Sequence, residues 1–277
     1  MNDIKKPLAT KKRRVRVLLM ESEPKYNPDI FEEDACWEQR VSEHELRRLN
    51  TIVDAVPEGV VSIIDVGCGD GKLTRLLRQA GYEVMAVDRS ATALKRVPEP
   101  KLCISGEQLP FEDDSFDLAV CSEVLEHLPE PLLSNVTAEL QRVARSTIIV
   151  TVPFEEDIHH FQVTCAQCAH RFNPYGHLHS FNRHDLAALM SLPSTITHIE
   201  KPQPYYHPTL KHFAFGILKR SVFVHHCVCP NCKTTDFSHL KTDYIRKMIG
   251  GLNRILTRGR TIQAGWLMAI YSKVEAA

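Results

Sequence analysis

The sequence contains no apolar run near the roughly 18 residues that cross a bilayer, so we expect no transmembrane segment. It also lacks an excess of charge, because 34 lysines and arginines balance 34 aspartates and glutamates. Zero net charge argues against attraction of the whole surface to nucleic acid. The basic residues 1–20 end in a stretch, residues 15–20, that is too short and too charged for a signal-peptide core. We therefore predict a cytoplasmic protein.

A disulfide scaffold is not indicated either. The nine cysteines are an odd number, and we find no export signal that would favour oxidised pairs. Internal repeats and low-complexity tracts are also missing. With 277 residues, 43% of them hydrophobic and 25% charged, the chain fits one globular core with a small accessory unit.

Hydrophobic periodicity predicts an alternation of helices and strands. Helices are expected at residues 31–55, 72–80, 90–97, 130–143 and 183–190. Strands are expected at residues 60–66, 82–87, 101–105, 116–121 and 147–152, with two more at 196–200 and 266–271. Strands that alternate with crossover helices predict an α/β fold, a doubly wound, mostly parallel, seven-stranded sheet of the Rossmann-like kind.

A glycine-rich loop follows the first expected strand. The sequence there is DVGCGDG, residues 65–71, and glycines let a backbone take positive φ and approach a ligand closely. The loop lacks the Gly-Lys-Ser/Thr of a phosphate-binding P-loop, and its third glycine comes one residue too early for a dinucleotide loop. Asp88 lies 21 residues after Gly67, near the offset at which an acid meets a ribose. The pattern suits a ribose-bearing ligand without a pyrophosphate.

Four blocks between residues 60 and 153 carry a family resemblance. They are IIDVGCGDG (63–71), AVDRS (86–90), GEQLPFEDDSFDLAVCSEVLEHL (106–128) and RVARSTIIVTVP (142–153). In order and spacing they resemble class I methyltransferases of type 11, which bind S-adenosylmethionine. The resemblance implies that the cofactor contacts come from residues in and after the strands: Asp65, Gly67, Gly69, Gly71, Asp88, Arg89, Gly106, Glu107, Gln108 and Glu123.

The resemblance assigns these residues to parts of the cofactor. Asp65, Gly67 and Glu123 would lie near its methionine end, and Asp88 would hold the ribose. The adenine would lie beside Arg89 and the segment 107–109. Many relatives have an acid two residues before Glu107, but Ser105 stands here, which shifts the contact with the adenine amino group to Gly106 or Glu107.

Five side chains are candidates for a catalytic base: His127, His177, His179, Tyr175 and Glu123. The sulfonium methyl of this cofactor is already activated, so a base is needed only for an acceptor whose proton has a high pKa. His127 lies in the LEHL sequence of the third block, and His177 and His179 lie in the sequence GHLHSF. Structural hydrogen bonding of His127 and simple loop packing of the other two histidines remain alternatives.

Two CxxC pairs predict a structural zinc site. The pairs are Cys165 with Cys168 and Cys229 with Cys232, and four thiolates suit tetrahedral zinc with no open position for catalysis. Cys227 or His170 would be a substitute for one ligand. Free thiols and a redox pair are the alternatives, although neither pair opens a thioredoxin-like unit.

These predictions divide the chain into four segments. Residues 1–30 are expected to form a flexible basic arm, and residues 31–153 an N-terminal helix with the S-adenosylmethionine-binding core. Residues 154–240 would form a substrate-side lid with the zinc knuckles, and residues 241–277 a basic helix and the closing strand of the core.

The sequence favours a methyltransferase acting on a small-molecule or glycan-like acceptor. An RNA-modifying methyltransferase is one alternative, in which the knuckles and the basic residues 241–260 grip RNA. No Asn/Asp-Pro-Pro-Tyr/Phe motif follows the fourth strand, so we do not expect a nucleic-acid acceptor. The other alternative is a catalytically inactive binding protein, which the intact glycine loop argues against.

Overall fold

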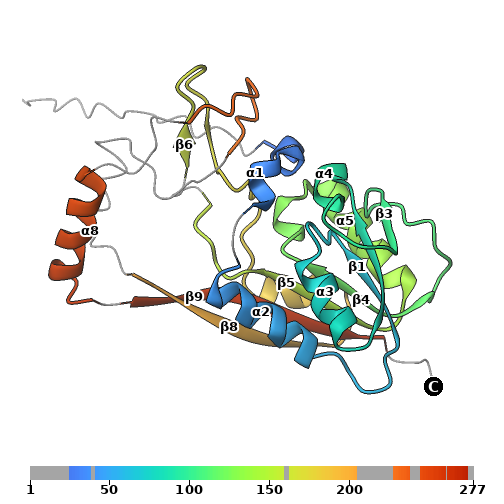
Figure 1. The fold of residues 1–277 in the computed structure, drawn as a ribbon. Coiled ribbons are helices and arrows are strands. Elements are labelled where there is room, and N and C mark those ends of the chain that lie inside the picture. The colour runs from blue at the N-terminus through green and yellow to red at the C-terminus, as the bar shows by residue number, and fades with distance from the viewer. Residues whose placement is uncertain are drawn as a thin grey trace, which may run out of the picture.

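The core of the molecule is a seven-stranded sheet in the order β3-β2-β1-β4-β5-β9-β8 (Figure 1). The computed structural model describes residues 25–38, 41–158, 162–204, 227–237, 244–259 and 261–273. The strands are β1 Ser62–Val66, β2 Glu83–Asp88, β3 Lys101–Cys103, β4 Phe116–Ser122, β5 Ala144–Pro153, β8 Ser194–Pro204 and β9 Thr261–Ser272.

Neighbouring strands from β3 to β5 pair in parallel, as the sequence predicts. Their central residues are buried because helices cover both faces, which is why they read as continuous β-branched runs. β9 runs antiparallel to both β5 and β8. The prediction of a mostly parallel, seven-stranded Rossmann-like sheet is therefore confirmed.

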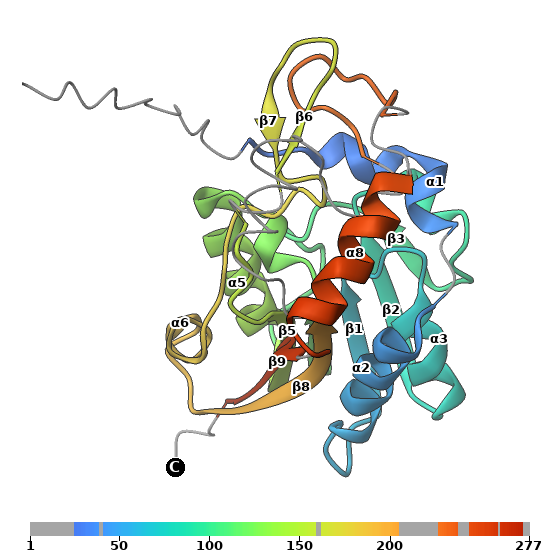
Figure 2. The same ribbon diagram turned by 90° about the vertical axis from the view of Figure 1, so that its left-hand side faces the viewer.

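Helices on the two faces of the sheet bury two apolar clusters (Figures 1 and 2). On one face α2 (Glu43–Asp54) and α3 (Lys72–Gln79) contribute apolar side chains such as Leu49 and Leu77. On the other face α5 (Glu130–Val143) and α6 (Arg183–Ala188) contribute Leu140 and Leu186. The remaining helices are η1 Pro28–Glu32, α1 Asp34–Trp37, α4 Ala91–Leu94, η2 Leu125–His127 and α8 Tyr244–Leu256.

The single helix predicted over residues 31–55 is wrong. The chain forms η1 and α1 first, and α2 begins afresh after Ser42. The Ser42 hydroxyl accepts a hydrogen bond from the backbone N–H of Glu45 at 3.1 Å, and the Glu45 carboxylate accepts one from the Ser42 N–H at 3.4 Å. This capping box is a helix start, so the apolar residues on either side of it belong to separate helices.

The expectation of a flexible arm is also wrong for residues 25–30. Asn27 and Ile30 are each only 4% exposed, and η1 begins at Pro28. The rest of the predicted arm, residues 1–24, lies outside the described residues. We call residues 25–37, which include η1 and α1, the N-terminal strap.

A small cysteine-rich lobe lies beside the strap (Figures 1 and 2). It consists of the hairpin β6–β7 (Val163–Thr164 and Arg171–Phe172) and residues 227–237. The Asn27 amide donates to the Val228 carbonyl at 2.7 Å, and Lys233 pairs with Asp29 at 2.6 Å. The strap is thus bonded directly to the second half of the lobe. Within the described part of the chain, no helix combines the length and apolarity of a bilayer span.

Candidate functional site

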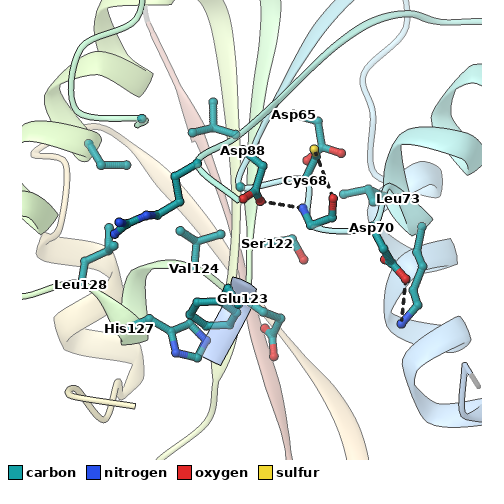
Figure 3. A pocket seen from close by; sticks show the side chains of 18 of the residues that line it. Asp65, Cys68, Asp70, Leu73, Asp88, Ser122, Glu123, Val124, His127 and Leu128 are labelled. Carbon is teal, nitrogen blue, oxygen red and sulfur yellow. Dashed lines mark hydrogen bonds and ion pairs between the residues drawn. The ribbon is translucent and has the colours of Figure 1, made fainter. Parts of the chain in front are cut away.

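A cavity of about 240 Å³ opens at the carboxyl ends of β1, β2 and β4 (Figure 3). Carboxyl ends of neighbouring parallel strands meet at one edge of the sheet, which is where ligands bind in this type of fold. Among the predicted cofactor residues, the cavity is lined by Asp65, Gly67, Gly69, Asp88, Arg89, Gly106 and Glu123. Seven of the ten predicted cofactor residues therefore lie on one surface.

The loop requires glycines because of their backbone conformation and because of the side chains packed against them. Gly67, Gly69 and Gly71 have φ values of +76°, +55° and +77°, a region that residues with side chains rarely adopt. A Cβ at Gly67 would lie 2.3 Å from Val124, and one at Gly69 would lie 2.8 Å from the Trp37 ring. Gly71 differs from the other two, because it begins α3 and is outside the cavity wall.

Asp88 fixes the loop from the end of β2. Its carboxylate accepts hydrogen bonds from the backbone N–H of Gly69 at 2.8 Å and from that of Ser90 at 2.7 Å. The side chain still faces the cavity (Figure 3), although the residue is only 9% exposed. Burial raises the pKa of Asp88, and the two backbone donors oppose that shift.

Asp65 is buried at the end of β1. The residue is 1% exposed, and its carboxylate accepts a 2.6 Å hydrogen bond from the Thr74 hydroxyl. Burial raises the pKa of Asp65 to about 6, because the charged form loses hydration that one hydroxyl does not replace. A charged aspartate at this position lowers the stability of the protein. A residue that lowers stability in this way usually serves a functional site and not the fold.

Replacing Asp65 with asparagine should stabilise the protein in a pH-dependent way. The folded pKa of about 6 exceeds the ordinary value, so wild-type stability falls as pH rises from about 4 to 6. An asparagine side chain cannot ionise, and we expect the advantage of Asp65→Asn to grow over that interval to on the order of 2–3 kcal/mol. Urea unfolding of both proteins between pH 3.5 and 7.5 measures the difference, and a difference that stays flat contradicts the shifted pKa.

The other predicted residues occupy different positions around the cavity. Glu123 has a φ of +59°, and its carboxylate lies 3.8 Å from the guanidinium of the buried Arg48. Strained non-glycine residues of this kind cluster at functional sites. Glu107 lines a neighbouring hollow rather than the main cavity, together with Arg89. Gln108 is exposed and lines neither of these two hollows.

Sequence reasoning missed the contribution of the residues that precede the sheet. Tyr26, Phe31 and Trp37 of the strap line the cavity, as does Arg48 of α2. Tyr26 covers the Arg89 guanidinium, whose Cζ lies 5.7 Å from the ring centroid. Phe31 and Trp37 were predicted to lie in one helix, residues 31–55, and no local signal in the sequence indicates that they reach a site more than 30 residues downstream.

The three candidate histidines are not equivalent. His127 lines the cavity at the end of η2, and its ring packs edge-on against His177 with the centroids 4.6 Å apart. His177 bonds through Nδ1 to Glu156. His179 bonds through Nε2 to the Leu128 carbonyl at 2.7 Å and is not part of the cavity wall. The structure therefore brings one of the three directly to the cavity and a second behind it.

The two CxxC pairs come together in the lobe. The Sγ atoms of Cys165 and Cys232 are 3.5 Å apart, and those of Cys168 and Cys229 are 3.6 Å apart. All four sulfurs lie within 4.8 Å of one another. Tetrahedral zinc with Zn–S bonds of about 2.3 Å places sulfurs about 3.8 Å apart, so the donor set fits this metal. Cys227 is buried beside the group, but its sulfur is not one of these four.

The sheet order, the glycine loop and the acid after β2 define a Rossmann-like methyltransferase fold. Residues 64–150 match the family model described as "Methyltransferase domain". The fold also resembles the solved S-adenosylmethionine-dependent methyltransferase from Archaeoglobus fulgidus, with a TM-score of 0.51 and 18% identity. That match covers 84% of this chain and 95% of the other. The methyltransferase resemblance predicted from the sequence blocks is therefore confirmed.

The curated relatives match about a third of this chain. The ubiquinone biosynthesis O-methyltransferases of Ralstonia nicotianae and Methylococcus capsulatus are 34% and 35% identical over 101 and 92 residues. The matches cover 32% and 30% of this chain. They cover 42% and 38% of the relatives, so the chain spans less than half the length of the relatives it matches. The cysteine-rich lobe, at residues 162–172 and 227–237, falls outside the matched family model.

Proposed function

We propose that the protein transfers a methyl group from S-adenosylmethionine to a small-molecule or glycan-like acceptor. The observation that carries the proposal is the cavity at the strand ends, where the glycine loop is pinned by Asp88. When bound, the cofactor would supply an electrophilic methyl group for a lone pair of the acceptor, with the electrons of the carbon–sulfur bond left on sulfur. The protein's part is alignment and exclusion of water.

Each end of the cavity suits a different part of the cofactor. Near β4, Arg48 and Glu123 provide both charges for the amino and carboxylate groups of the methionine end. On the other side, Tyr26 and Arg89 form a flat surface against which an adenine ring can stack. Asp88 lies between these two ends, where a carboxylate can accept hydrogen bonds from ribose hydroxyls.

Two observations support a small acceptor. The net charge is zero, and the motif typical of enzymes that act on flipped bases is missing after β4. The matched relatives are named for ubiquinone biosynthesis, which is a small-molecule pathway. An RNA acceptor would instead require binding at physiological salt with a steep salt dependence.

We also propose that the four lobe cysteines hold one structural zinc ion. The four sulfurs all lie within 4.8 Å of one another, which is close enough for one tetrahedral ion. A four-thiolate site has no open position, so the ion would organise the lobe and leave the chemistry to the cavity.

A labelling experiment tests the proposed reaction. The purified protein is incubated with methyl-labelled S-adenosylmethionine and a cell extract that contains both metabolites and RNA, and the products are separated by size and chemistry. We expect the label in a small, protease- and nuclease-resistant compound. Label that appears in RNA alone would show that the acceptor is RNA and not a small molecule. If the protein binds the cofactor but transfers no label, the result would favour a catalytically inactive binding protein.

A further inference from the structure

A second cluster of metal-binding side chains lies behind the cavity wall. Glu126 and His127 come from η2, directly after β4, and His177 comes from the loop between β7 and α6. Each offers one ligand atom, and these atoms all lie within 4.8 Å of one another. The cluster shares no residue with the four cysteines.

Three buried polar atoms of this cluster have no hydrogen-bond partner within the described part of the chain. Glu126 is 1% exposed, yet neither of its carboxylate oxygens has a hydrogen-bond partner there. The Nδ1 atom of His127 is also buried without a partner, and its Nε2 lies 3.9 Å from Oε1 of Glu126. Buried polar groups are nearly always satisfied, and a buried carboxylate in particular needs a positive partner.

The surrounding backbone holds the cluster in place. The Glu126 carbonyl accepts hydrogen bonds from the N–H groups of Leu178 and His179, at 2.7 and 3.2 Å. These bonds tie the loop that carries His177 to the end of β4. Glu156 bonds to Nδ1 of His177, which orients the ring and leaves Nε2 available. A carboxylate behind a histidine is the usual support for a histidine that binds a metal.

We propose that Glu126, His127 and His177 bind a divalent transition-metal cation at the wall of the methyl-transfer cavity. Two imidazoles with one carboxylate favour Mn²⁺, Fe²⁺, Co²⁺ or Zn²⁺ over the all-oxygen ions Mg²⁺ and Ca²⁺. Three protein ligands leave open coordination positions, unlike the closed site of the four cysteines. His127 belongs both to the cluster and to the cavity wall, so the cation borders the space for the acceptor.

The role of this cation rests on the proposed methyl transfer. It narrows the class of acceptor molecule. A cation at an open site binds an oxygen of the acceptor and lowers the pKa of a hydroxyl. The hydroxyl proton passes to solvent, and the oxygen electron pair then forms the bond to the methyl carbon as the bond to sulfur breaks. The acceptor would accordingly be a hydroxyl compound, and no single side chain need act as the base.

The probe is Mn²⁺ added to the full chain with its cysteine site filled by zinc. Thiolates prefer zinc to manganese, so Mn²⁺ reports the Glu126 cluster rather than the cysteine site. We expect one bound Mn²⁺ per chain, measured from the electron paramagnetic resonance signal of the free ion. Glu126→Gln, which keeps the side-chain shape, and His177→Ala should each weaken Mn²⁺ binding at least about tenfold.

His179→Ala is the matched control, since His179 is two residues from His177 but bonds to the Leu128 carbonyl instead. We expect its Mn²⁺ affinity to equal that of the wild type. S-adenosylmethionine affinity is measured in every variant, and normal affinity shows that the fold is intact. Folded Glu126→Gln and His177→Ala proteins that bind Mn²⁺ like the wild type, or a wild type that binds none, would overturn the cation site. Failure of the wild type to bind S-adenosylmethionine would instead overturn the proposed function.

Discussion

Gly69→Val is expected to weaken S-adenosylmethionine binding at least about 100-fold, which corresponds to about 2.7 kcal/mol. Valine must adopt a φ of +55°, and its Cβ would come within 2.8 Å of the Trp37 ring. Positive φ alone strains a residue with a side chain by about 1–3 kcal/mol. The loop will move to relieve both effects, and that movement breaks the 2.8 Å hydrogen bond between the Gly69 N–H and Asp88. Isothermal titration calorimetry measures the affinity directly.

The chain offers a matched control for this substitution. Gly81 also has a positive φ, +101°, but a Cβ built there meets no atom within 4 Å, and the residue is outside the cavity wall. Gly81→Val should therefore lower stability and leave cofactor affinity unchanged. Normal binding by Gly69→Val, or equal affinity of the wild type for NAD, would contradict the proposed cofactor site.

Asp88→Ala should also weaken S-adenosylmethionine binding. It removes the acceptor that holds Gly69 and Ser90, and it removes the carboxylate proposed to hold the ribose. Asp88→Asn separates the two effects, because its amide oxygen can still accept one of the backbone hydrogen bonds. We expect Asn to lose less affinity than Ala, and equal losses would assign the whole effect to the ribose contact.

Removing zinc from the lobe is expected to lower turnover by about 100-fold and also to weaken cofactor binding, because the strap carries Tyr26 of the proposed adenine surface. The lobe is bonded to the strap through Asn27 and Asp29, and the strap presents Phe31 and Trp37 to the cavity. Displacing such groups by about 1 Å is enough to cost about 10²-fold in rate. The sheet has its own apolar clusters and should stay folded.

Metal analysis of the reduced protein should find one zinc per chain, bound by Cys165, Cys168, Cys229 and Cys232. The double variant Cys165→Ser with Cys232→Ser should lose the zinc and the turnover together. Cys227→Ser is the control, because Cys227 is buried in the same cluster but lies outside the group of four sulfurs. Zinc content that falls in the control and persists in the double variant would show that the ligands were assigned incorrectly.

The parallel strands of the sheet were predictable because each is buried on both faces and therefore reads as a continuous apolar run. The lengths of its last two strands were not. β8 extends to Pro204 and β9 begins at Thr261, beyond the predicted ranges 196–200 and 266–271. In these extensions β8 and β9 pair with each other, and pairing through backbone hydrogen bonds does not produce a hydrophobic pattern in the sequence.

For the candidate site too, residues that act through local contacts were predictable from the sequence, and residues that act through distant contacts were not. The glycine loop and Asp88 were identifiable because their chemistry depends on spacing along one strand–loop–helix unit. The grouping of the four cysteines was identifiable because each pair is itself a local motif. The strap aromatics and Glu126 were missed, since Trp37 meets Gly69, and Glu126 meets His177, only after the chain has folded.

The position of β9 has a consequence for how the protein is made. It is the last strand of the described chain, yet it lies inside the sheet between β5 and β8. During synthesis β5 emerges long before its partner and presents an unpaired edge, the kind of surface at which chains aggregate. The roughly 120 residues from Pro153 to Ser272 take about 6–24 s to add at 5–20 residues per second. Nascent chains on neighbouring ribosomes of one message would thus expose unpaired β5 edges to one another. Protection of the nascent chain during that interval will govern the yield of folded protein.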